Sequence, residues 1–312
     1  AGGLASRSTS ALSVTNCSRA SFSVRTKRSF CADIVATIYS VLTARMRQQA
    51  GRLAESALDP WMLAYEGMML RELREATSNG EACARFRSAL QREPDLVLAH
   101  FGLGLANYDR VLNQFGSPSE ALEQMAACAE RCITLAPHAA EGYYLSSRYH
   151  QARGELSLSA RMLTEAIGHN PSFGAAHALL AQVLVLTGQF DTGLQRMLHA
   201  VRLGPRSFVS GLAVVHFARK EYAEGLTAAE KALSINSAYP FARGIASACA
   251  LWLGHTDVAQ AHFRELCRIA PTFVPGEFRR HFGADVEPVD RLATALDMLR
   301  SGKTFPAVKQ RT

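Results

Sequence analysis

Three prolines, Pro137, Pro171 and Pro205, follow one another at intervals of 34 residues. Each closes the same pattern of small and large apolar residues, with an alanine-class residue five positions before the proline. A fixed period of this length is typical of a helix–turn–helix unit that is repeated along the chain and buries its apolar face only by stacking on its neighbours. The period therefore predicts an all-α fold that acts mainly as a scaffold.

The same pattern, with some variation in length, divides the central part of the chain into about six units. These units end at Pro94, Pro137, Pro171, Pro205, Ser237 and Pro271. In the first unit we expect helices at 63–75 and 81–91 with a turn at 78–80. The second unit spans 43 residues between its flanking prolines, and a Gly-Ser-Pro sequence at 116–118 predicts that its excess forms a longer turn at 113–120.

The residues inside each unit carry a family resemblance. In the fourth unit the matching residues are His177, Leu180, Ala181, Leu184, Gly188, Phe190, Gly193, Ala200 and Pro205. On these positions the chain resembles a tetratricopeptide-repeat protein from about residue 63 to residue 271. The resemblance implies a right-handed superhelix of about six repeats over 59–271, whose first helices line a concave groove that binds proteins or peptides.

A few residues depart from that family pattern. Gly193 and Gly225 replace a small alanine of the second helix, and Lys220 replaces the glycine of the turn. Because glycine weakens a helix relative to alanine by up to about 1 kcal/mol, we expect Gly193→Ala to stabilise the protein.

The groove candidates follow from the motif positions, read outward along the first helix of each repeat. They turn from polar to apolar along the chain. The eight candidates are Tyr144, Arg148, Gln182, Val185, Val214, Phe217, Phe241 and Leu251.

The segments outside the repeats differ in composition. Residues 1–32 are rich in serine and basic residues and predict a disordered tail, and 33–58 predict an amphipathic helix and a linker. Residues 272–312 contain an apolar stripe at helical spacing, made of Val289, Leu292, Leu296 and Leu299. We expect this helix to cap the sixth repeat, as terminal units of a solenoid require. The alternative is that it lies in the groove and a partner displaces it.

Charge and hydropathy exclude several classes of function. Residues 1–52 hold eight basic residues and one acidic residue, whereas the remainder is neutral, with 26 of each sign. The repeat body therefore lacks the basic surface that nucleic acids require, and we expect no nucleic acid to bind through it. No apolar run approaches the roughly 18 residues of a membrane span. Cysteines at inward-facing positions favour a reducing, cytoplasmic location.

No arrangement of residues predicts catalysis, a cofactor or a metal. Cys128 and Cys132 share one helix face, but no second pair of ligands accompanies them. There is no Gly-x-Ser-x-Gly elbow and no phosphate-binding loop. We expect a non-catalytic chain with no metal and no cofactor.

A narrower resemblance concerns the order of segments. An amphipathic helix, a degenerate first repeat, a long second repeat and a closing helix at 289–300 resemble the C-terminal half of bacterial signalling proteins. Those proteins join an adenylate-cyclase-like domain, or a winged-helix DNA-binding domain, to a tetratricopeptide region. The resemblance implies a scaffold or sensory module of such a protein, the regulatory half of a cyclase-like enzyme, or the effector half of a transcription regulator, with the output domain before residue 1.

Overall fold

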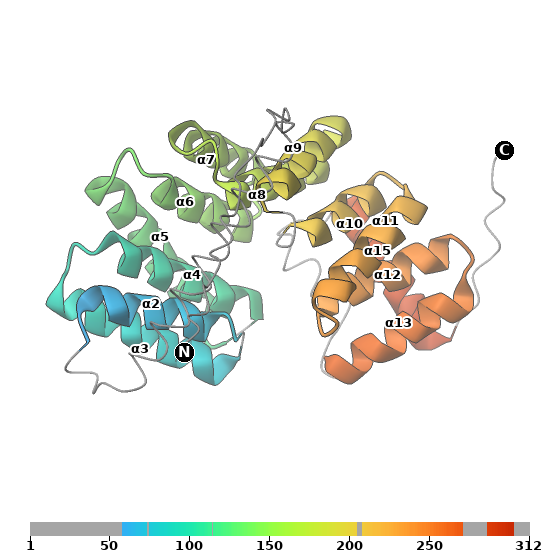
Figure 1. Ribbon diagram of the computed structural model, residues 1–312, viewed down its shortest axis with the longest axis horizontal. Helices are drawn as coiled ribbons and strands as arrows, with labels where there is room; N and C mark the ends of the chain where they lie inside the picture. The colour runs from blue at the N-terminus through green and yellow to red at the C-terminus, as the bar shows by residue number, and fades with distance from the viewer. Residues whose placement is uncertain (1–57, 74, 114, 205–207, 271–285, 303–312) are drawn as a thin grey trace, which may run out of the picture. The chain divides into compact units, whose positions relative to one another are not determined.

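The computed structural model describes residues 58–73, 75–113, 115–204, 208–270 and 286–302 (Figure 1). The chain divides into two compact units, and all described residues belong to the second, Met46–Thr312. The tail expected at 1–32, and the helix and linker expected at 33–58 up to residue 57, lie outside the described residues.

The described residues form helices in six consecutive pairs, followed by one further helix (Figure 1). No strand occurs among them, and the all-α prediction is confirmed. The pairs are α2 (Pro60–Arg71) and α3 (Ala76–Arg92), α4 (Val97–Asn113) and α5 (Pro118–Leu135), α6 (Ala140–Ala152) and α7 (Leu156–His169), α8 (Gly174–Leu186) and α9 (Phe190–Leu203), α10 (Val209–Ala218) and α11 (Tyr222–Ile235), and α12 (Pro240–Trp252) and α13 (Thr256–Ile269). The further helix is α15 (Glu287–Ser301).

Local sequence explains where the helices begin and end. Asp59 caps α2 by accepting a hydrogen bond from the Met62 amide at 2.8 Å, and a proline follows it at the first helical position. Between the helices of the third, fourth and sixth repeats a glycine adopts a positive φ. Lys220 takes this place in the fifth repeat with φ 66°, which confirms that it replaces the turn glycine.

Two expectations about the first repeats are wrong. The predicted turn at 78–80 lies inside α3, and the chain turns instead between Arg71 and Ala76. The excess residues of the second repeat lengthen its helices rather than its turn, since α4 and α5 have 17 and 18 residues where α6 and α7 have 13 and 14. A helix absorbs such an insertion because each added residue adds a backbone hydrogen bond.

Small residues allow the helices of one repeat to approach the next. A Cβ atom on Gly104 would lie 2.2 Å from a methyl group of Leu145 on the following repeat. The geometry also contradicts the expected stabilisation by Gly193→Ala. A Cβ atom there would lie 2.6 Å from a Val185 methyl group and 3.0 Å from the Ala181 carbonyl oxygen. Gly193 therefore serves close packing, and an added methyl group would force α9 away from α8.

Within the described ranges the buried apolar side chains form two large clusters and a smaller one. One large cluster extends from Leu58 to Val183 and the other from Leu186 to Leu299. The small cluster surrounds Met197 in the fourth repeat. Helix α8 contributes to all three and buries ten of its 13 residues. The long apolar run of this helix therefore reflects burial on every side.

Candidate functional site

The predicted groove residues lie on the first helix of each repeat, which we call helix A. The helix-A surface is the face of these first helices on which the predicted groove residues lie. Three of the candidates, Gln182, Val214 and Phe241, line one hollow together with Ile245. They come from α8, α10 and α12, so the structure brings together one predicted residue from each of three successive repeats.

A second hollow lies beside the first and is closed by the last helix. Gln182, Val185, Val214 and Phe217 line it from the repeats, and Val289 and Leu292 of α15 line it from the other side. Helix α15 therefore lies on the helix-A surface of repeats five and six. Its main contacts are with α12 and α13 of repeat six, as expected of a capping helix, and it also reaches α10 of repeat five.

Four of the predicted groove residues belong to the core. Val185, Phe217 and Leu251 are only 2%, 2% and 3% exposed, and Tyr144 is 7% exposed. Leu251 lines neither of the two hollows and packs in the cluster that contains α15. Residues of a first helix that point toward a neighbouring helix follow the same spacing as those that point to a ligand, so the pattern does not separate the two.

One arginine anchors α15. The guanidinium of Arg291 donates hydrogen bonds to the carbonyl oxygens of Phe217 and Ala218, at 2.8 Å and 3.0 Å. These carbonyls end α10, where a helix terminus attracts a positive charge. Arg291 also stacks on the Phe217 ring at 5.0 Å and pairs with the Glu287 carboxylate.

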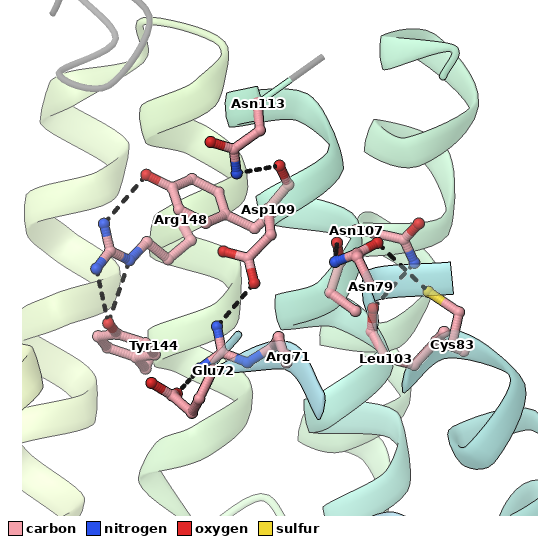
Figure 2. A network of polar contacts seen from close by, with 12 residues as sticks. Arg71, Glu72, Asn79, Cys83, Leu103, Asn107, Asp109, Asn113, Tyr144 and Arg148 are labelled. Carbon is pink, nitrogen blue, oxygen red and sulfur yellow. Dashed lines mark hydrogen bonds and ion pairs between the residues drawn. The ribbon is translucent and has the colours of Figure 1, made fainter. Parts of the chain in front are cut away.

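A second arginine lies on the helix-A surface of the third repeat. Arg148 donates to the Tyr144 hydroxyl from Nε and Nη2, at 3.1 Å and 2.9 Å (Figure 2). Its Nη1 donates at 3.2 Å to the Tyr108 hydroxyl and at 3.2 Å to Gln151 Oε1. The guanidinium lies 4.9 Å from the centre of the Tyr108 ring and 5.4 Å from that of Tyr144. Among the described residues no carboxylate pairs with Arg148.

The surroundings of Arg148 set the charge of each group. Burial alone would lower the pKa of the Arg148 guanidinium, but the two phenolic oxygens raise the pKa above its ordinary value. Burial raises the pKa of Tyr108. At neutral pH the cluster therefore carries one positive charge, and the Tyr108 hydroxyl keeps its proton and can donate it in a hydrogen bond.

Sequence reasoning predicted Tyr144 and Arg148 but missed Tyr108 and Gln151. A signal for both was present. Tyr108 lies four residues after the small residue Gly104, and Gln151 lies four residues after the small residue Ser147. Val185, which was predicted, lies at the equivalent position of the fourth repeat. The same position is Gln151 in the third repeat and Tyr108 in the second, so aligning the repeats on Val185 would have identified both.

Next to this cluster an ion pair joins the first two repeats. Arg71 at the end of α2 donates to Asp109 on α4 at 2.9 Å, and each side chain is 18% exposed (Figure 2). The same guanidinium contacts Glu72. The Asp109 carboxylate is thus engaged by Arg71 and does not neutralise Arg148.

Comparisons with known proteins identify the fold. No protein-family description matches the chain, and no curated protein matches it by sequence. Among solved structures, TTC0263, a thermophilic TPR protein of Thermus thermophilus, is 20% identical. The similarity covers 62% of this chain and 99% of that one with a TM-score of 0.52. The fold is that of a tetratricopeptide-repeat solenoid.

Longer solenoids give higher scores over more of the chain. A monomeric IFIT1 mutant solved with m7Gppp-AAAA has a TM-score of 0.62 at 14% identity, over 86% of this chain and 66% of IFIT1. The APC/C hetero-tetramer Cut9–Hcn1 has a TM-score of 0.57 at 13% identity, over 82% of this chain and 52% of that one. At these low sequence identities, the similarity to these structures is evidence for a shared fold only.

The cysteines of this tetratricopeptide solenoid have the properties of core residues. Burial raises the pKa of Cys128 and of Cys132 to about 12, so both thiols are protonated at neutral pH. Cys132 Sγ lies 3.8 Å from the Val97 carbonyl oxygen. Within the described ranges no three histidine, cysteine, aspartate or glutamate side chains gather in an arrangement that could hold a metal ion. In the same ranges no helix is long and apolar enough to cross a membrane.

Proposed function

We propose that this chain is a non-catalytic scaffold that binds a protein or peptide partner on the helix-A surface of repeats two to four. The observation that carries the proposal is α15, a segment of the same chain that already lies on the helix-A surface of repeats five and six. An amphipathic helix in this position supports the view that the surface accepts a protein segment.

The binding mode of α15 supplies the details. Its apolar stripe is buried, with Leu292 and Leu296 at 2% and 0% exposure, and Arg291 fixes it to backbone carbonyls. Repeats two to four also present aromatic side chains that a partner could contact, and Phe101, Tyr144 and Phe173 lie close together there. A partner segment would use the surface as α15 does, through apolar contact and a few directed hydrogen bonds.

Site-specific photo-cross-linking in the source cells tests this proposal. A benzophenone amino acid replaces Gln182 on the helix-A surface, and in a control chain it replaces Arg161, which is exposed on α7. We expect a partner band from position 182 that is absent from position 161. Equal bands from the two positions, or bands from position 161 alone, would contradict binding on the helix-A surface.

The wider context rests on the sequence resemblance. We propose a cytoplasmic sensory module of a bacterial signalling protein, with a cyclase-like or a winged-helix output domain as the two alternatives. The neutral repeat body supports a protein rather than a nucleic acid as partner. The coding sequence upstream of residue 1 tests it: acidic metal ligands in a strand context indicate a cyclase, and a basic recognition helix indicates a DNA-binding regulator.

A further inference from the structure

Repeats two, three, four and six tie the start of their first helix to the end of the preceding repeat in the same way. A side chain donates a hydrogen bond to the backbone carbonyl oxygen six residues before it. The ties join His100 to Pro94 at 2.8 Å, Tyr143 to Pro137 at 3.0 Å, His177 to Pro171 at 3.0 Å and Arg243 to Ser237 at 3.2 Å. An imidazole, a phenol or a guanidinium can therefore make the tie, but these groups respond differently to pH.

His177 makes its tie from a buried position, since the residue is only 3% exposed. A carbonyl oxygen only accepts hydrogen bonds, so Nε2 must carry the proton, and Nδ1 is the bare nitrogen of the neutral ring. Nδ1 is buried, and no described residue forms a hydrogen bond with it. A proton added to Nδ1 would create a buried, charged N–H group that has neither water nor an acceptor, which is costly.

Helix α9 presents basic side chains to His177. The His199 and His177 rings meet edge to face, with centroids 4.5 Å apart. Arg202 donates to Nδ1 of His199 at 3.2 Å, and the positive charge of Arg196 acts on His177. The carboxylate of this helix, Asp191, pairs instead with the arginine that caps α10. Nothing on α9 thus offsets a positive charge on His177.

Helices α7 and α10 also pack against α8 and bring no carboxylate to His177. Their titratable side chains are Arg161, Glu165, His169 and His216. The first two are exposed, and the two histidines contact Tyr143 and Glu221. Burial lowers the pKa of His177 below its ordinary value of 6.5; the hydrogen bond to Pro171 opposes this change, and the charge of Arg196 adds to it.

We propose that His177 makes the fourth repeat acid-sensitive: uptake of a proton at Nδ1 drives the ring out of its buried position, breaks the tie to Pro171 and loosens the start of α8. The ring must turn outward because only water can accept from the new N–H group. The Tyr143 tie of the third repeat lacks this response, since a phenol has no second nitrogen. The inference adds a regulatory input to the proposed scaffold and does not depend on its partner.

Native-state hydrogen exchange of the full chain at pH 7.5 and pH 5.5 tests the proposal. Below pH 6.5 the opened segment takes up a proton that the closed one excludes, so stability that is present above 6.5 is lost as the pH falls. After correction for intrinsic exchange rates, the opening constant of the amides at 176–181 should rise about tenfold between the two pH values. An opening constant that does not rise would overturn the proposal.

Two histidine-to-tyrosine variants make a matched comparison. His177→Tyr copies the tie of the third repeat and should remove the tenfold rise, because the phenol takes up no proton in this range. His100→Tyr is the control: His100 makes the same tie, but it is only partly buried and its second nitrogen is not buried without a partner. This control should keep the rise. An equal rise in His177→Tyr and the parent protein would contradict the role of His177.

A titration of the parent protein keeps the test decisive if His177→Tyr does not fold. The imidazole signal of His177 is followed by NMR and assigned through its contact with the His199 ring. It should titrate with a midpoint below 6.5, together with the loss of protection in α8. A midpoint at or above 6.5, or titration while α8 stays protected, would overturn the proposal.

Discussion

The two ends of the helix-A surface differ in how the surface is covered and in how the charge of an arginine is matched. In repeats five and six the surface is apolar, and the chain covers it with α15, whose Arg291 brings its own carboxylate from Glu287. In repeats two and three the surface is aromatic and polar, and the guanidinium of Arg148 has no such partner among the described residues. The first arginine is matched by a carboxylate of its own helix, whereas the acceptors of the second among the described residues are hydroxyl and amide oxygens.

The largest effect is expected from substitutions that loosen α15 from repeats five and six. Leu292→Ala and Leu296→Ala should each cost about 2–5 kcal/mol of folding free energy, because both side chains are fully buried. Hydrogen exchange should accelerate in α10 and α12 and stay unchanged in α4 and α6. Equal acceleration at both ends would show that the two regions do not differ as described.

A pair of matched substitutions compares the two arginines directly. Arg291→Met should cost about 1.5–3 kcal/mol, since it removes charged hydrogen bonds to the Phe217 and Ala218 carbonyls, of which Phe217 keeps the Lys220 amide as a donor. Arg148→Met should cost less than about 1 kcal/mol, because it removes a charge that lacks an anion. Urea denaturation measures both, and the reverse order would remove the distinction between the matched and the unmatched arginine.

The fourth repeat, which lies between the two regions, gives a test of packing. Gly193→Ala should destabilise the protein by about 1–3 kcal/mol, because the new methyl group meets Val185 and a backbone oxygen. Gly168→Ala is the control: a Cβ atom there meets nothing within 4 Å, so it should stabilise α7 by up to about 1 kcal/mol. Melting temperatures that move in the same direction would contradict the assigned packing.

The turn of the fifth repeat predicts a smaller gain. Lys220 adopts φ 66° where other repeats have glycine, and its contact with Glu287 at 3.7 Å is exposed. Lys220→Gly should therefore stabilise the protein by about 1 kcal/mol, since the left-handed backbone strains a side chain more than the surface ion pair contributes. Chemical denaturation measures the change, and a loss of stability would mean that the Lys220 contact matters more than the strain.

The smallest expected effect is on the pH dependence of folding stability, and it should be similar in the two regions. Hydrogen bonds from His150, then from Arg153, lower the pKa of Glu155 below its ordinary value of 4.5. In the other region burial raises the pKa of Glu221, but hydrogen bonds from His216 and Arg219 outweigh it and lower the pKa overall.

A lowered carboxyl pKa stabilises the fold above the ordinary value, and the contribution disappears as the pH falls through the lower one. Urea midpoints at pH 6.5 and pH 3.5 should therefore differ less in Glu155→Gln and in Glu221→Gln than in the parent protein. An unchanged difference in either variant would show that its ion-pair cluster contributes nothing to the pH dependence.

The repeated helix pairs of this fold could be predicted from the sequence, but the places where a repeat departs from the pattern, such as the turn of the first repeat, could not. Proline and glycine punctuate the turns through their own backbone preferences, so the helix pairs and the unusual Lys220 were readable. The turn predicted at 78–80 failed because packing overrides local turn preference when Asn79 is buried and donates to the Ala106 carbonyl.

The site was only partly readable for a related reason. Arg148 and Tyr144 follow from motif positions, but the direction in which α15 lies does not follow from its apolar stripe, because both a terminal cap and a groove occupant require the same spacing. The hydrogen bond from Arg148 to Tyr108 depends on distances between repeats, which a one-dimensional pattern does not contain.

Helix α8 has a consequence for how this molecule responds to force or to heat. Its residues share contacts with every hydrophobic cluster, so the loss of this single helix would separate the amino-terminal repeats from the carboxy-terminal ones. A solenoid held only by nearest neighbours can melt gradually from its ends. Here we expect melting that begins at either end to stop at α8, and the loss of α8 itself to unfold both sets of repeats together.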